Sequence, residues 1–80
     1  MTWEEVYERL NGVFREILED EAISLKDETV ADDVEGWDSF EHIHLIAGVE
    51  EEFGFRVPMG KVVHLKNVGE LVDLIMEKGE

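Results

Sequence analysis

Apolar residues recur at the spacing of one helix face in several stretches of the chain, which is typical of amphipathic helices. The first helix is expected from Trp3 to Leu18, because Thr2 and Glu5 form a capping box at its start and the pattern stops at Glu19. Its apolar positions are Trp3, Val6, Tyr7, Leu10, Val13, Phe14, Ile17 and Leu18. These residues predict one apolar stripe that faces a core.

Two further helices are marked by similar signals. One is expected from Ser39 to about Phe53, with Asp38 as its N-cap and Gly54 as its C-terminal stop. The last helix follows the capping-box pair Asn67 and Glu70 and ends before Gly79. It places Val68, Leu71, Val72 and Ile75 on one stripe. A short helix from about Met59 to Leu65 is expected between these two, with Pro58 at its first position.

The segment between the first two long helices follows neither a helical nor an alternating period. It still contains four apolar residues, which are Ile23, Leu25, Val30 and Val34. We expect a long ordered loop that these residues hold against the core, and loops of this length are often functional. The predicted fold class is all-α: a four-helix bundle with three longer helices and one short helix, forming a single domain over residues 1–80.

Composition narrows the range of partners. The chain has 21 Asp and Glu residues against 7 Lys and Arg, which gives a formal net charge of -14. Such a field repels nucleic acid and anionic membranes and favours basic protein partners. No apolar stretch approaches the length of a membrane span, no leader is visible, and cysteine is absent. We therefore expect a cytoplasmic monomer without disulfides or a zinc finger.

Ser39 is the candidate for chemistry, because it follows the N-cap Asp38 in the first turn of a helix. Free backbone N–H groups and the positive end of the helix dipole favour an attached phosphate there. A serine at this position is more often only a helix starter. Its neighbours decide between the two interpretations.

The helix that Ser39 begins carries more apolar surface than one core face needs. Its core stripe consists of Leu45, Ile46, Val49 and Phe53. A second stripe, rotated around the helix axis, consists of Phe40, Ile43 and Ala47 and is bordered by Glu41, Glu50 and Glu51. The second stripe indicates a docking face for a partner with an apolar patch and basic residues. Alternatively, both stripes are buried because the helix is packed from two sides.

Catalytic and metal-binding motifs are weak. His42 follows Ser39 on the same helix and points inward, and no G-x-S-x-G nucleophile elbow is present. The window from Asp27 to Asp38 fails the calcium-loop pattern at its fifth, sixth and twelfth positions. We therefore expect neither an enzyme nor a metal site.

These features together resemble the acyl carrier protein family, and the resemblance spans nearly the whole chain. Asp38-Ser39 opens a helix that ends in Val49-Glu50-Glu51-Glu52-Phe53-Gly54. The following Phe55-Arg56-Val57-Pro58 is similar to the apolar-x-apolar-Pro exit of that family. The resemblance implies an acyl carrier fold and a single acyl carrier domain.

The resemblance also implies roles for individual residues. Ser39 matches the serine to which a phosphopantetheinyl transferase attaches 4′-phosphopantetheine from coenzyme A with magnesium, and Asp38 would contact that transferase. Partner enzymes with basic docking patches would transfer, condense or ligate acyl groups. Their contacts would be Phe40, Glu41, Ile43, Ala47, Glu50 and Glu51. The positions near an acyl channel are matched by His42, Leu45, Ile46 and Val49.

Two departures from the family pattern qualify the expected cargo. Phe40 replaces the usual Leu after the serine, and His44 stands where fatty-acid carriers usually have Glu. Because His42 makes the channel more polar, we expect a short acyl group. The predicted function is a carrier of acyl thioesters in fatty-acid, polyketide or related specialised biosynthesis. The alternatives are an acidic helical adaptor or inhibitor that binds a basic surface without a prosthetic group, and a peptidyl or aminoacyl carrier domain.

Overall fold

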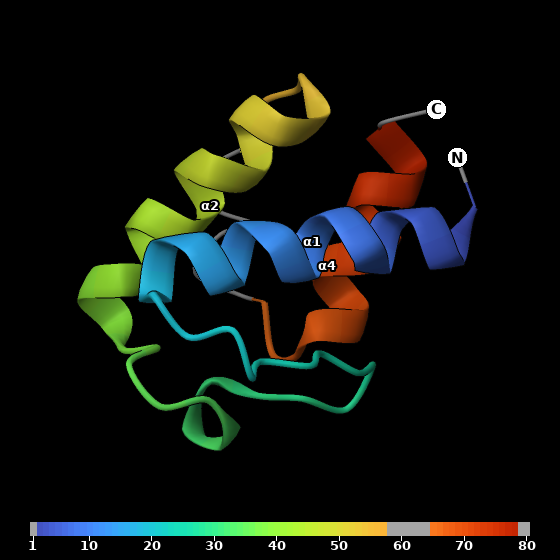
Figure 1. Cartoon of the computed structure of the whole chain (residues 1–80). Helices are drawn as coiled ribbons and strands as arrows, with labels where there is room; N and C mark the ends of the chain where they lie inside the picture. Colours follow the sequence, from blue (N-terminus) through green and yellow to red (C-terminus); the bar gives the residue numbers. More distant parts are fainter. Residues whose placement is uncertain (1, 58–64, 79–80) are drawn as a thin grey trace.

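The computed structural model describes residues 2–57 and 65–78, which form three α-helices and one short 3-10 helix (Figure 1). In chain order these elements are α1 (Trp3–Leu18), η1 (Ala31–Asp33), α2 (Ser39–Phe53) and α4 (Val68–Lys78). Helix α1 packs against both α2 and α4. The predicted all-α class and the three longer helices are confirmed. The short helix expected from about Met59 to Leu65 lies almost wholly outside the described residues.

The three predicted N-caps start the helices as expected. A side-chain oxygen of each accepts a hydrogen bond from the backbone N–H three residues later: Glu5 to Thr2 (3.1 Å), Glu41 to Asp38 (2.8 Å) and Glu70 to Asn67 (2.9 Å). Helix α2 ends at Gly54, whose φ of 74° lies in the left-handed region that glycine adopts without strain. Local sequence signals therefore set both ends of the helix that begins at Ser39.

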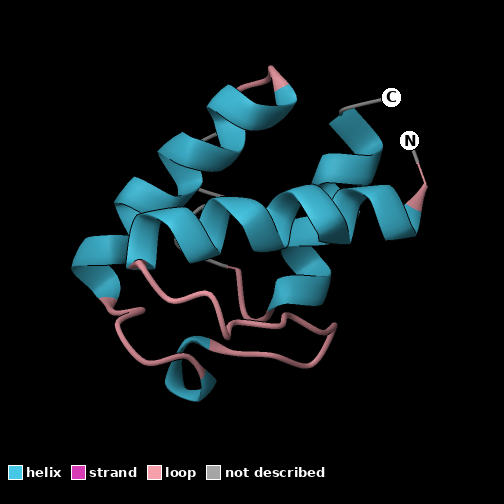
Figure 2. Ribbon diagram, viewed as in Figure 1, coloured by secondary structure: helices cyan, strands magenta, loops and turns pink. Residues whose placement is uncertain are grey.

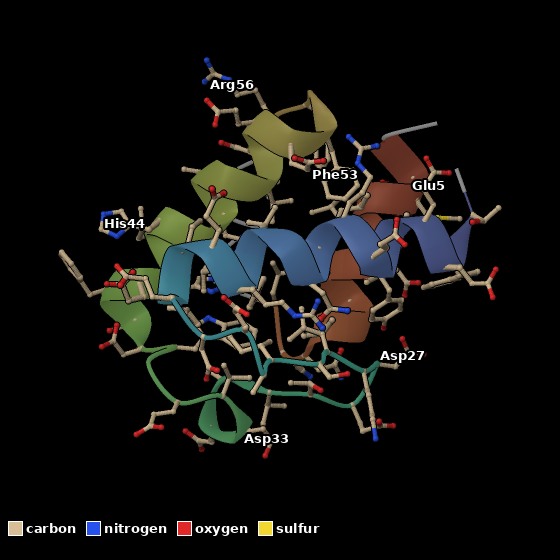
Figure 3. All side chains as sticks on the ribbon, in the orientation of Figure 1. Glu5, Asp27, Asp33, His44, Phe53 and Arg56 are labelled. Atoms are coloured by element: carbon tan, nitrogen blue, oxygen red, sulfur yellow. The ribbon has the colours of Figure 1, made fainter. Side chains whose placement is uncertain are left out.

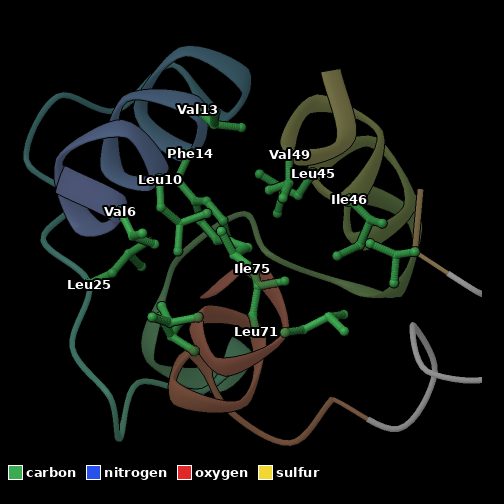
Figure 4. Packing of buried hydrophobic residues seen from close by; sticks show 14 of the residues in the cluster. Val6, Leu10, Val13, Phe14, Leu25, Leu45, Ile46, Val49, Leu71 and Ile75 are labelled. Atoms are coloured by element: carbon green, nitrogen blue, oxygen red, sulfur yellow. The ribbon is translucent and has the colours of Figure 1, made fainter. Parts of the chain in front are cut away.

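The core lies where α1, α2 and α4 face one another (Figure 4). Each helix contributes fully buried residues to it, such as Phe14 from α1, Leu45 from α2 and Ile75 from α4. The predicted core stripe of α2 is confirmed, since Leu45, Ile46 and Val49 are buried and Phe53 packs against the cluster. Burial of these apolar side chains supplies the main driving force for folding.

The long connection between α1 and α2 lies along one side of the helices (Figure 2). Its Ile23 and Leu25 are buried in the core, as predicted. The side-chain oxygen of Asn11 on α1 accepts a hydrogen bond of 2.8 Å from the backbone N–H of Leu25. Within this connection the three residues of η1 were not expected, because one turn is too short to produce a hydrophobic period.

The same connection also holds the start of α4. The backbone N–H of Val68 donates to the carbonyl of Thr29, and the N–H of Gly69 donates to the carbonyl of Asp27, each at 2.9 Å. These bonds satisfy two N–H groups that a helix start otherwise leaves unpaired. The connection is therefore an ordered part of the fold that joins α1, α4 and the start of α2.

Candidate functional site

Ser39 is the first residue of α2, and it is exposed. Asp38 directly before it caps the helix through the backbone N–H of Glu41, and the carbonyl of Asp38 accepts the N–H of His42 at 2.8 Å. A group attached to the Ser39 hydroxyl would therefore lie at the positive end of a 15-residue helix. The geometry fits an attached phosphate.

A cavity of about 460 Å³ opens beside this helix start. It lies between η1, the beginning of α2 and the beginning of α4. Its lining residues are Ala31, Asp32, Trp37, Asp38, Ser39, His42, Ile43, Leu65, Lys66, Asn67 and Leu71. The hydroxyl-bearing Ser39 is thus part of the wall of a mostly apolar cavity, whose volume falls within the range of small-molecule pockets.

Two aromatic residues form part of this wall and contact each other. The indole N–H of Trp37 donates a hydrogen bond of 3.1 Å to Nδ1 of His42, and their rings stack with centroids 5.9 Å apart. Trp37 also packs edge-to-face against the buried Phe14 of α1, at 4.9 Å between ring centroids. His42 faces inward, as the sequence predicted, and its ring is tied to the segment that precedes Ser39.

The second apolar stripe of α2 lies next to this site and faces solvent. Phe40 is 70% exposed, Ile43 is 49% exposed, and Ala47 is exposed as well. The alternative in which both stripes are buried is therefore wrong. Contiguous exposed apolar side chains on a monomer often mark an interaction site.

The carboxylates beside this stripe differ in their surroundings. Glu41 contacts Nδ1 of the exposed His44 at 3.3 Å, and Figure 3 shows His44 pointing away from α2. Glu50 is half-buried and accepts a hydrogen bond of 2.6 Å from the backbone N–H of Val57. Glu51 is exposed. The structure thus brings the predicted docking residues together on one face, although Glu50 also stabilises the chain after α2.

The predicted channel residues divide into two groups. His42 lines the cavity beside Ser39, whereas Leu45, Ile46 and Val49 belong to the buried core. Among the described residues, 2–57 and 65–78, those that line this cavity do not include Leu45, Ile46 or Val49. A role for them in holding an acyl chain stays a prediction.

Two other kinds of feature, a metal site and a membrane span, are absent from the described residues. No group of three or more His, Asp or Glu side chains in residues 2–57 and 65–78 is arranged to hold a metal ion. None of the helices in those ranges is long and apolar enough to cross a membrane.

Comparison with known proteins identifies the family. Residues 8–75, most of the chain, match the family described as the phosphopantetheine attachment site. The chain belongs to the acyl carrier protein family. A holo acyl carrier protein from Geobacter metallireducens has a similar structure, with a TM-score of 0.84 and 37% sequence identity. That match covers 91% of this chain and 84% of the other.

Curated relatives agree with this assignment. An acyl carrier protein from Guillardia theta is 29% identical over 79 residues, which cover 98% of this chain and 96% of the relative. Another from Caulobacter vibrioides is 28% identical over 74 residues, which cover 92% of this chain and 95% of the relative. One from Saccharopolyspora erythraea is 27% identical over 77 residues, covering 96% of this chain and 81% of the relative.

Family membership establishes the general role. Acyl carrier proteins are carriers and not catalysts, and their prosthetic group is phosphopantetheine. Membership also implies interactions with a phosphopantetheinyl transferase and with enzymes that handle acyl groups. The expectations of a non-enzymatic carrier and of this prosthetic group are confirmed by the comparisons.

Several residues of the site were not predicted from the sequence. Trp37, Asp32, Lys66 and Leu71 line the cavity, although none was singled out as a site residue. Trp37 had one available signal, because a large aromatic residue stood directly before Asp38. Lys66 and Leu71 come from a segment distant in sequence, and only the packed fold brings them to Ser39.

Proposed function

We propose that the chain carries acyl groups as thioesters on a 4′-phosphopantetheine arm attached to Ser39, and delivers them to partner enzymes. The observation that supports this most strongly is the position of an exposed serine hydroxyl at the start of α2, on the rim of a cavity of about 460 Å³. The arm, when attached, supplies a terminal thiol that forms the thioester. The chain itself contains no cysteine that could do so.

The residues around Ser39 would hold the attached phosphate in place. The first turn of α2 offers backbone N–H groups and the positive end of the helix dipole. Asp38 caps this helix, and we infer that it also contacts the transferase, as the family resemblance implies. The cavity offers shelter from water to the group that follows the phosphate.

Docking of partner enzymes is assigned to the exposed face of α2. The proposed contacts are Phe40, Glu41, Ile43, Ala47, Glu50 and Glu51. Apolar side chains rimmed by carboxylates complement a partner surface with an apolar patch and basic residues. Such an interface gives fast association and moderate affinity, which allows one partner to replace another.

The proposed pathway is fatty-acid, polyketide or related specialised acyl biosynthesis, and the proposed cargo is short. The lining of the cavity beside Ser39 includes Leu71, which is 2% exposed and belongs to the core. The polar ring of His42 on its wall is less suited to a long saturated chain. A peptidyl or aminoacyl carrier would use the same arm with a different cargo.

The experiment that tests this function uses acetyl-coenzyme A, magnesium and a broad-specificity phosphopantetheinyl transferase. Intact mass should increase by one acetyl-phosphopantetheine. Neutral hydroxylamine should then remove only the acetyl group, because it cleaves thioesters and leaves the phosphodiester intact. A folded protein that gains no mass with two different transferases would favour the acidic adaptor, which needs no prosthetic group.

A further inference from the structure

Three aromatic rings in successive contact, those of Phe14, Trp37 and His42, join the buried face of α1 to residues on both sides of Ser39. The ring of Trp37 lies 4.9 Å from that of Phe14, at an interplanar angle of 83°. It lies 5.9 Å from the ring of His42, at 17°. Phe14 is fully buried, so it fixes Trp37 to the core, and Trp37 in turn contacts the first turn of α2. Trp37 and His42 thus lie on either side of Ser39 along the chain, and all three line the same cavity.

The hydrogen bond between Trp37 and His42 depends on the protonation state of His42. An indole N–H can only donate, so Nδ1 of His42 must accept the bond of 3.1 Å from Trp37. A neutral imidazole can do this when its proton is on Nε2. A protonated imidazole carries hydrogen on both nitrogens, and two donors would then face each other.

We propose that Trp37 and His42 are positioning residues for Ser39: their hydrogen bond fixes the turn that carries the serine for modification, and protonation of His42 breaks that bond. This inference rests on the proposed attachment at Ser39. Because histidine changes charge between about pH 5 and pH 8, the bond forms at the upper end of this range and is lost toward the lower end.

Charged groups of three segments share the cavity wall with His42. They are Asp32 of η1, Asp38 before α2, and Lys66 before α4. The residue of α1 that packs against Trp37 is Phe14, which is apolar.

The reaction affected is the attachment step. The Ser39 oxygen forms a bond to the phosphorus of the pantetheine phosphate, and the pyrophosphate bond of coenzyme A breaks. The serine proton passes to a base of the transferase, and adenosine 3′,5′-bisphosphate leaves. Orientation of the attacking oxygen affects mainly kcat, because the attack requires aligned reacting atoms. Carrier docking, reported by KM, should change less.

The test measures kcat of modification at saturating carrier between about pH 5 and pH 8 for three variants beside the wild type. Trp37→Phe keeps an aromatic ring against Phe14 but lacks the donor. His42→Asn offers an amide oxygen as acceptor and does not titrate in this range. Trp3→Phe is the matched control, since Trp3 is 46% exposed at the start of α1 and stacks on Tyr7 rather than on His42.

The ratio of the wild-type kcat to the variant kcat is taken at each pH, because this ratio cancels the pH dependence of the transferase itself. Trp37→Phe should lower kcat about five-fold at pH 8, the loss expected for one hydrogen bond, and the ratio should approach one at pH 5. His42→Asn should match the wild type at pH 8 and exceed it at pH 5. Trp3→Phe should follow the wild type throughout. A ratio for Trp37→Phe that does not change with pH would overturn the inference.

A second measurement needs no transferase. In the wild-type protein, the NMR resonance of the Trp37 indole N–H should shift with the titration of His42, whereas that of Trp3 should not. A Trp37 resonance that stays fixed while His42 titrates would overturn the inference. Complete failure of modification at every pH would instead contradict the attachment at Ser39, and the NMR titration would still test the hydrogen bond.

Discussion

At the scale of single residues, chemically similar side chains near Ser39 differ in their contacts and exposure. The two histidines of α2 are an example: His42 accepts a hydrogen bond from Trp37 inside the cavity wall, whereas His44 is exposed beside Glu41. His44 also meets Phe40 edge-to-face at 5.1 Å. It therefore lies within the proposed docking face, where its charge can change the field that a basic partner meets.

His44 should make docking dependent on pH. Protonated His44 pairs with Glu41 and removes negative charge from the face, so affinity for a basic partner should fall from pH 8 to pH 6. The His44→Gln variant should lose part of this dependence, by about two-fold in Kd, which is typical of one exposed ion pair. Calorimetric titration with the transferase, without coenzyme A, measures this. Identical pH profiles for variant and wild type would refute it.

The residue scale also shows which site features the sequence could predict. Asp38 and Ser39 were identified because capping depends on neighbours along the chain. The role of Trp37 was not, because its contact with Phe14 crosses 23 positions, and no local pattern encodes that distance. The burial of Leu45 and Val49 was predicted from helical spacing, but spacing cannot separate a core side chain from one that lines a channel.

At the scale of elements, the connection after α1 is held to that helix by Tyr7. Its hydroxyl donates a hydrogen bond to Asp27. Burial of the phenol raises the pKa of Tyr7 well above its usual value, and the bond to Asp27 and the nearby carboxylates of Asp27, Glu28 and Asp73 raise it further. The folded state therefore favours the protonated phenol.

The sign of the resulting pH dependence follows from that raised pKa. The contribution of the protonated Tyr7 phenol to stability is fully present below the ordinary tyrosine pKa of about 10. It is lost as the pH rises through the folded-state value. We expect Tyr7→Phe to lower the free energy of unfolding by about 1 kcal/mol at pH 8. Urea denaturation should show this difference shrinking above about pH 10. A constant difference at all pH values would argue against the bond.

The α1–α2 contact depends on Gly48. An added Cβ there would lie 2.6 Å from Cδ1 of Ile17 and 3.0 Å from Cγ1 of Val13, whereas one at Gly12 on α1 would meet nothing within 4 Å. A glycine inside a helix weakens that helix relative to alanine, whether or not it packs against a neighbour. Only the packing shows that Gly48 also permits close approach of the two helices.

These two glycines give a matched pair of substitutions. Gly12→Ala should raise the free energy of unfolding by about 1 kcal/mol, the usual difference in helix propensity. Gly48→Ala should bring no such gain, because the stiff side chain of Val13 must move. Urea denaturation of both variants measures the difference. An equal gain at both positions would show that the interface has room for a methyl group.

At the scale of the whole molecule, the fold class was predictable because three apolar stripes and their caps agree with one another. The path of the connection between α1 and α2 was not, since it is set by long-range bonds such as that from Val68 to Thr29. The charge of -14 acts on the entire domain and had been evident from composition alone. It disfavours the compact state through self-repulsion.

This charge should make stability depend on salt. Raising sodium chloride from about 10 mM to about 200 mM shortens the screening length to below the size of the domain, so the melting temperature should rise. Differential scanning calorimetry at constant pH measures the shift. A melting temperature that is unchanged or lower in salt would show that favourable ion pairs, such as that of Arg9 with Glu52, outweigh the repulsion.

The central claim is that Ser39 carries the prosthetic group, and one measurement tests it most directly. Wild type and Ser39→Ala are incubated with coenzyme A, magnesium and a broad-specificity transferase, and their intact masses are compared. The wild type should gain one phosphopantetheine, and Ser39→Ala should gain none while keeping the same helical circular dichroism spectrum. A mass gain on Ser39→Ala would contradict the assigned site, and no gain on a folded wild type would contradict the carrier function.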